Sequence, residues 1–233
     1  MTDITTRLLA VRQRITTAEL CFDRAPGSVR LLAVSKGQPL AALQEAIAAG
    51  QCCFGESYAQ EALIKMTALR DSALEWHFIG PLQRNKTRSV AANFACVQSL
   101  DRLALAERLH AQRPADLPAL QVCIEVNVSG EASKSGVAPA DVPALAAAIA
   151  ALPRLRLRGL MALPAPVSEF DAQLAGFQRL RALYEELRTR GYALDTLSMG
   201  MSDDLEAAIA AGATLVRVGT AIFGERPAKA FPE

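Results

Sequence analysis

Eight short apolar runs alternate with longer stretches of helical spacing, and this alternation limits the folds open to the 233-residue chain. Short apolar runs between turn signals are typical of buried strands, whereas apolar residues three or four apart indicate helices. The strand-like runs lie at 29–35, 51–54, 75–79, 94–98, 120–128, 155–161, 194–197 and 214–218. The helical stretches lie at 39–49, 57–70, 82–92, 101–112, 139–151, 168–190 and 202–211. The alternation predicts an α/β fold, a single (β/α)₈ TIM-like barrel, with a doubly wound open sheet as the structural alternative.

A further helix is expected before the first strand-like run. Ile4, Leu8, Val11, Ile15 and Leu20 recur at spacings of three to five, which is typical of an amphipathic helix. We therefore expect one barrel domain over 1–233, in which 1–28 form a leading helix and linker.

Composition excludes several classes of protein. The net charge is +1, with 20 Arg and 5 Lys, so the strong basic excess of a nucleic-acid-binding surface is lacking. No stretch reaches the roughly twenty apolar residues of a membrane span, and the amino terminus has no secretion-signal pattern. The five cysteines show no disulfide-framework or metal-ligand spacing. We expect a cytoplasmic protein with reduced thiols.

Lys36 ends the first apolar run and is followed directly by Gly37. In a barrel this position lies on the carboxyl-terminal rim of the strands, where active sites occur. A lysine that has lost part of its hydration reaches its neutral, nucleophilic form near neutral pH, as Schiff-base formation with a carbonyl requires. A strand-end lysine that points into solvent is the alternative interpretation.

Glycine and hydroxyl residues follow the seventh and eighth runs. Ser198 and Gly200 come just after the seventh run, and Gly219 and Thr220 come just after the eighth. Glycine lets bare backbone N–H groups approach a phosphate, and the loops after strands seven and eight are the usual phosphate position in barrels. Each pair alone is more often an ordinary loop, but the two together favour phosphate.

Arg217 lies within an otherwise apolar run, so its charge must be paired. The partner is either a structural acid or a ring nitrogen or acid group of a ligand held beside Lys36. An aldehyde on an aromatic ring, a phosphate and a ring nitrogen together describe pyridoxal 5′-phosphate (PLP). His77, at the end of the third run, is either an acid–base group or a hydrogen-bonded structural residue. Lys134, after the fifth run, either attracts a second phosphate or a client protein, or is solvated.

The chain resembles the pyridoxal phosphate homeostasis protein family, which is related to the barrel domain of fold-type III enzymes such as alanine racemase. The resemblance covers 29 to 225 and rests on seven motifs in order. They are Leu32–Lys36, Phe54–Glu56, Trp76–Lys86, Ser133–Gly136, Arg158–Ala162, Leu197–Asp204 and Val216–Thr220.

The resemblance implies that Lys36 carries PLP as an internal aldimine and that Arg217 faces the pyridine nitrogen. It implies that the phosphate is held by Ser198, Gly200, Gly219 and Thr220, and the cofactor-binding set also includes Met199 and His77. Ser57 departs from the family, which often has Asn after Phe-Gly-Glu, so no ligand contact is assigned to it.

Three functions are open. The favoured one is a monomeric carrier that holds PLP on Lys36, contributes to vitamin B6 homeostasis and passes the cofactor to apo-enzymes. The second is a single-domain PLP-dependent amino-acid racemase, although only Tyr58 of the three tyrosines follows a strand end. The third is a Schiff-base aldolase whose phosphate belongs to the substrate. No metal is expected in any of them.

Overall fold

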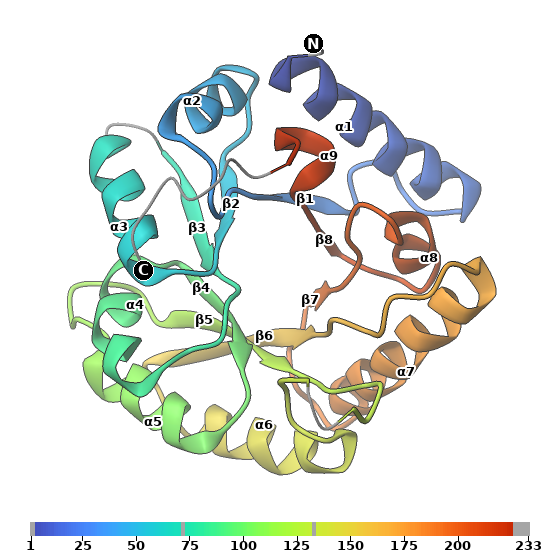
Figure 1. Cartoon of the computed structure of the whole chain (residues 1–233). Coiled ribbons are helices and arrows are strands. Elements are labelled where there is room, and N and C mark those ends of the chain that lie inside the picture. Colours follow the sequence, from blue (N-terminus) through green and yellow to red (C-terminus); the bar gives the residue numbers. More distant parts are fainter. Residues whose placement is uncertain (1–2, 71–72, 132–133, 226–233) are drawn as a thin grey trace.

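The strands form a closed parallel barrel in chain order, β1 to β8 (Figure 1). The computed structural model describes residues 3–70, 73–131 and 134–225. The strands are β1 Arg30–Val34, β2 Cys53–Glu56, β3 Glu75–Phe78, β4 Cys96–Leu100, β5 Leu120–Glu125, β6 Leu155–Met161, β7 Thr196–Ser198 and β8 Leu215–Val218. β8 pairs with β1, Arg30 lying opposite Leu215. This pairing confirms the predicted barrel and excludes the open sheet.

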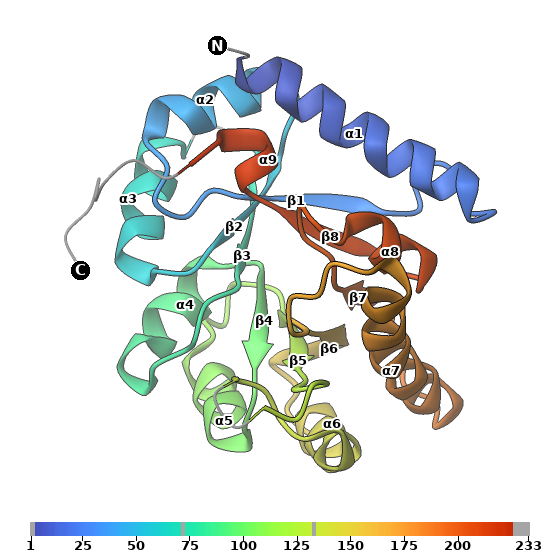
Figure 2. The same cartoon turned by 45° about the vertical axis from the view of Figure 1, so that its right-hand side comes forward.

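Helices connect the strands and surround the barrel (Figure 2). The α-helices are α1 Ile4–Cys21, α2 Leu40–Ala48, α3 Ala59–Ala68, α4 Thr87–Asn93, α5 Leu103–Gln112, α6 Val142–Ala150, α7 Phe170–Thr189, α8 Leu205–Ala210 and α9 Thr220–Phe223. Two short 3₁₀ turns, η1 Arg84–Lys86 and η2 Pro139–Asp141, precede α4 and α6. Every predicted helical stretch contains a helix, and all begin or end within a few residues of the expected bounds.

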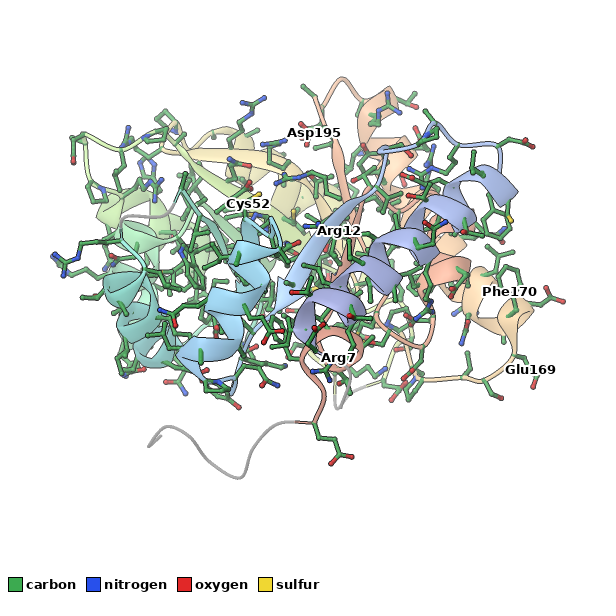
Figure 3. The ribbon with its side chains drawn as sticks, turned by 90° about the horizontal axis from the view of Figure 1, so that it is seen from above. Arg7, Arg12, Cys52, Glu169, Phe170 and Asp195 are labelled. Carbon is green, nitrogen blue, oxygen red and sulfur yellow. The ribbon has the colours of Figure 1, made fainter. Side chains whose placement is uncertain are left out.

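The predicted leading helix is confirmed as α1, which packs across α2, α8 and α9. Arg12 fixes it by donating to the carbonyl oxygens of Ala49 and Gly50, at the end of α2 (Figure 3). One part of the prediction was wrong. Leu20 is 61% exposed, and Ala18 and Glu19 take the buried positions of the last turn, because a 3.6-residue period does not bring residue 20 back to the inner face.

The barrel has an outer and an inner core. The large outer core joins strand and helix side chains, among them Leu8 and Phe54. Two small clusters consist of strand residues and lie inside the barrel, where Leu32 packs with Cys53 and Leu215, and Cys96 with Cys123 and Met161. Alternation along each strand therefore assigns every other side chain to the barrel interior.

The two faces of the barrel are distinct. Cys52 and Asp195 directly precede β2 and β7 and mark the amino-terminal face, whereas Glu169 and Phe170 begin α7 on the side of the opposite face (Figure 3). All five cysteines are free thiols, with Cys21 and Cys52 exposed and the other three buried. Across the described ranges, no helix combines the length and apolarity that crossing a bilayer requires.

Candidate functional site

Lys36 follows β1, and Arg217 lies in β8, the strand beside it. β1 and β8 pair with Leu32 opposite Arg217, so Lys36 lies four residues further along the chain than the arginine's partner. Leu32 faces the barrel interior, and β1 ends at Val34, two residues before Lys36. Lys36 is half-buried in the turn that follows β1. An amine and a guanidinium thus share the carboxyl-terminal end of the barrel.

Arg217 is buried inside the barrel, with 4% of its surface exposed. Its Nη1 donates to Oγ of Ser198 at 2.6 Å, and its Nη2 donates to the carbonyl oxygen of Ala162 at 2.9 Å. Burial lowers the pKa of Arg217 to about 10, although the carboxyl groups of Asp204 and Glu125 oppose this shift. The guanidinium therefore stays charged at neutral pH, and among the described residues it donates to Ser198 and Ala162.

A chain of hydrogen bonds continues from Ser198 across the barrel. The hydroxyl of Ser198 donates to Oε1 of Gln98 at 2.6 Å, and Nε2 of Gln98 lies 2.7 Å from Nδ1 of His77. His77 in turn places Nε2 2.7 Å from Oε1 of Glu75. With the amide in this orientation, Nδ1 accepts from Gln98 and Nε2 donates to Glu75. The predicted site residue His77 is thereby linked to Arg217 through two intervening side chains.

Where this chain of hydrogen bonds ends, at Glu75, a thiol, a carboxylate and an imidazole lie together. The spacing of these residues in the sequence did not predict this cluster. The ligand atoms of Cys53, Glu75 and His77 all lie within 4.8 Å of one another. The hydrogen bond from His77, with that from Arg30, lowers the pKa of Glu75 to about 2. Burial raises the pKa of Cys53 to about 12, so its thiol stays protonated. Because the carboxylate already pairs with Arg30 and His77, this cluster is the end of the hydrogen-bond chain.

Glycines shape the turns after β7 and β8. Gly200 has φ +93°, and a Cβ there would lie 2.5 Å from Cβ of Ala208 in α8. A Cβ at Gly219 would lie 3.2 Å from the carbonyl oxygen of Val34, at the end of β1. Both positions need bare backbone, and Gly219 lies directly against the strand that delivers Lys36.

Three predicted cofactor-binding residues differ in what they offer. Thr220 is exposed at the first position of α9, where N–H groups have no partner within the helix. The hydroxyl of Ser198, in contrast, is engaged by Arg217 and Gln98. Met199 packs in the outer core and donates its N–H to Leu215, so its side chain faces away from the barrel interior.

Two acidic residues near the carboxyl-terminal rim of the barrel were not predicted as site residues from the sequence. Glu125, the last residue of β5, is 7% exposed, and burial and the charge of Asp101 raise its pKa to about 7. Burial also raises the pKa of Asp204, whose Oδ1 accepts from the N–H of Met201. The alternation of Gln121, Cys123 and Glu125 along one strand was the available signal, since polar residues at every second position indicate an inner face.

Two residues left open by the sequence lie near this rim. Nζ of Lys134 lies 3.5 Å from a carboxylate oxygen of Glu131 and 3.4 Å from the carbonyl oxygen of Leu163. The neighbouring motif residue Ser133 lies outside the described residues. Ser57 is half-buried, and a Cβ on Gly80 would lie 2.4 Å from its carbonyl oxygen, so the two loops are in close contact.

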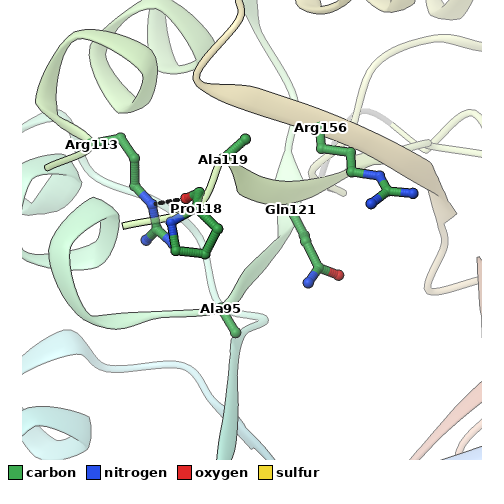
Figure 4. A pocket seen from close by; sticks show the side chains of 6 residues that line it. All are labelled: Ala95, Arg113, Pro118, Ala119, Gln121 and Arg156. Carbon is green, nitrogen blue, oxygen red and sulfur yellow. Dashed lines mark hydrogen bonds between the residues drawn. The ribbon is translucent and has the colours of Figure 1, made fainter. Parts of the chain in front are cut away.

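A cavity of about 230 Å³ lies at the other end of the barrel (Figure 4). Its lining residues precede or begin β4, β5 and β6; they are Ala95, Arg113, Pro118, Ala119, Gln121 and Arg156. Arg113 is held there by the carbonyl oxygens of Ala91, Phe94 and Pro118. Because barrel enzymes place their chemistry at the carboxyl-terminal face, this cavity is separate from the candidate site.

A closed barrel with a lysine and an arginine at adjacent strand ends defines a single-barrel protein with its candidate ligand site on the carboxyl-terminal rim. The model of the alanine racemase N-terminal domain matches residues 10–227. The chain belongs to the pyridoxal phosphate homeostasis protein family, a relative of that domain, as its motifs predicted.

Relatives of similar length support this assignment. The chain is 59% identical to the pyridoxal phosphate homeostasis protein of Pseudomonas aeruginosa, with 97% of each chain covered. It is 53% identical to the protein of that name from Escherichia coli, with 97% of this chain and 98% of the other covered. PipY of Synechococcus elongatus, solved with PLP bound, superposes with a TM-score of 0.82 at 37% identity, over 95% of this chain and all of the other. Alanine racemase of Corynebacterium glutamicum, at 21% identity and a TM-score of 0.66, shares the fold.

Proposed function

We propose that this protein binds PLP reversibly through a Schiff base on Lys36 and serves as a carrier in PLP homeostasis. The observation that carries the proposal is the pairing of β1 with β8, which makes the strand that leads to Lys36 the neighbour of the strand that holds Arg217. Two kinds of relative support it, namely proteins named for pyridoxal phosphate homeostasis and the PLP-bound PipY structure.

The residues at the rim fit PLP. The amine of Lys36, in the turn after β1, suits its aldehyde, and bare backbone at Gly219 and the first turn of α9 suits its phosphate. Arg217 would face the ring nitrogen as a hydrogen-bond donor. When bound, the cofactor supplies an electron-withdrawing ring and an aldehyde that exchanges between amines.

Arg217 limits the chemistry at this site. A guanidinium has no lone pair to accept a proton, so it cannot hold a proton on the ring nitrogen as a carboxylate does. A neutral ring withdraws electrons less strongly, which favours holding the cofactor over breaking bonds at a substrate carbon. We assign Ser198 to Arg217, whose orientation it fixes, and leave the phosphate to Gly200, Gly219 and Thr220.

The racemase alternative would need an acid–base group opposite Lys36. Tyr58 is 58% exposed at the start of α3, whereas Tyr184 is buried in α7 with its hydroxyl bound to the carbonyl oxygen of Leu194. Neither geometry favours proton transfer at a ligand held between Lys36 and Arg217. The structure offers no observation that favours the aldolase alternative.

The test is to locate the bound cofactor. Purified protein is mixed with PLP, reduced with borohydride and digested, and mass spectrometry identifies the labelled peptide. We expect the pyridoxyl group on Lys36, and unchanged labelling in a Lys134→Ala control. Label on other lysines of the wild-type protein, or none, would contradict the proposal.

A further inference from the structure

Lys36 sits at the corner of a tight turn. The N–H of Gln38 donates to the carbonyl oxygen of Ser35 at 3.0 Å, and Gly37 has φ +71°. These values describe a type II turn, in which glycine is the residue that accepts a positive φ. The direction of the Lys36 side chain therefore depends on how firmly the backbone of this turn is held.

A buried cluster of Glu56, Glu61 and Lys65 contacts the turn from β2 and α3. Lys65 is 1% exposed, and its Nζ lies 2.8 Å from Oε1 of Glu56 and 2.5 Å from Oε1 of Glu61. The Glu56–Glu61–Lys65 cluster thus combines one cation and two acids away from water.

The cluster binds the backbone on both sides of Lys36. On one side, Nζ of Lys65 donates to the carbonyl oxygen of Ser35 at 2.7 Å. On the other side, the N–H of Gly37 donates to Oε1 of Glu61 at 2.6 Å. The hydroxyl of Ser35 also donates to Oε1 of Glu56 at 2.6 Å. Lys36 is the residue enclosed between these contacts.

Stability alone does not explain such a cluster. Buried ion pairs often stabilise a protein no better than apolar residues of the same volume, because desolvation offsets the attraction between the charges. Burial raises the pKa of Glu56, and its buried Oε2 has no hydrogen-bond partner among the described residues. A cluster with two acids for one cation, placed at this turn, indicates a role for the turn itself.

We propose that the Glu56–Glu61–Lys65 cluster positions Lys36 for covalent capture of an aldehyde, an inference that rests on the proposed function of Lys36. In that capture Lys36 Nζ bonds to the aldehyde carbon, and the carbonyl oxygen leaves as water with the two amine hydrogens. The attack needs the amine about 3–3.5 Å from the carbon in a defined direction. A turn fixed at Ser35 and Gly37 restricts the long, flexible side chain to that approach.

The test separates covalent capture from binding. Lys65→Met removes the central cation, and Glu61→Gln removes one of the two acids, which leaves one acid for one cation. Capture of PLP is followed by absorbance. Binding of pyridoxine 5′-phosphate, which carries the same ring and phosphate but no aldehyde, gives the non-covalent affinity. Amide exchange of Gly37 and Gln38 is measured on protein without cofactor.

Two matched controls lie elsewhere in the fold. Glu19 is a buried acid that accepts from the N–H groups of Gly27 and Val29, before β1, so Glu19→Gln matches Glu61→Gln. Arg113 is a buried cation bound to three carbonyl oxygens at the amino-terminal face, so Arg113→Met matches Lys65→Met.

In both cluster variants we expect capture to slow by at least about tenfold and exchange of the two amides to quicken, while affinity for pyridoxine 5′-phosphate changes less than about twofold. Both controls should keep wild-type capture. Faster exchange with unchanged capture, or slowed capture in the controls as well, would overturn the positioning role. Wild-type protein that binds pyridoxine 5′-phosphate but captures no PLP would remove the proposed covalent function, and this inference with it.

Discussion

Glu125 shows how one inward-facing residue can tie stability to pH. It is buried at the inner end of β5, near Asp101 and Arg217, and burial raises its pKa from 4.5 to about 7. Between these two pH values the folded state keeps the proton that the unfolded state has released. The contribution of Glu125 to stability is therefore full below about pH 4.5 and is lost as the pH rises through about 7.

Glu125→Gln removes this dependence. A shift of this size corresponds to about 3 kcal/mol, so we expect the variant to be more stable than wild type by up to that amount above pH 7 and equal to it near pH 4.5. Urea unfolding of both proteins across this range gives the difference. Parallel stability curves for the two proteins would show that Glu125 ionises as an ordinary carboxyl.

Individual site residues differed in how far the sequence could predict them. Lys36 and Arg217 stand out because each interrupts or ends an apolar run, and burial of such a charge demands a partner. Gln98 carries no comparable local signal, since its partner Ser198 lies 100 residues away. The role of Lys65 likewise depends on a turn 30 residues earlier, which only the packing of α3 on β1 and β2 brings near.

At the scale of elements, the spacing of β6 and β7 depends on one glycine. Gly159 pairs with Thr196, and a Cβ on Gly159 would lie 1.6 Å from the carbonyl oxygen of that residue. Gly176, within α7, would place a Cβ 3.6 Å from Pro164, an ordinary van der Waals distance. Packing against β7 therefore requires glycine at position 159, whereas position 176 has room for a Cβ atom. The two positions can be compared directly with the same substitution.

We expect Gly159→Ala to lower the free energy of unfolding by more than about 3 kcal/mol, because the strands must separate to admit the methyl group. Gly176→Ala should raise it by about 0.5–1 kcal/mol, because alanine favours a helix interior. Urea unfolding measures both. Equal effects of the two substitutions would show that β6 and β7 adapt to the added carbon.

The elements themselves were largely predictable, because apolar periodicity reports which face of each is buried. All eight strands formed where the apolar runs predicted them. Leu20 was predicted to lie on the buried face of α1 but is exposed. Apolar spacing predicts burial whether or not another element packs against the residue. The inner polar chain was not predictable, since closure of the barrel decides which inward residues meet.

For the molecule as a whole, the proposed carrier function requires release as well as binding. Lys36 is half-buried in the turn after β1, at the carboxyl-terminal face, so we propose that an incoming amine reaches the same aldehyde from that face. We expect the PLP-loaded protein to reactivate an apo PLP-dependent enzyme in the presence of a phosphatase that destroys free PLP. The measurement is recovered enzyme activity, with free PLP as the control. Equal loss of reactivation in both samples would show that the cofactor passes only through solution.

The closure of β1 on β8 also bears on synthesis of the protein. Arg30 pairs with Leu215. The edge of β1 that does not pair with β2 therefore gains its hydrogen bonds only after β8 has left the ribosome. A nascent chain that ends before residue 215 carries Lys36 without Arg217 and has two unpaired sheet edges, which are prone to association with other chains. Lys36 and Arg217 belong to one barrel only after β8 has been synthesised, so a product truncated before β8 lacks the assembled candidate site.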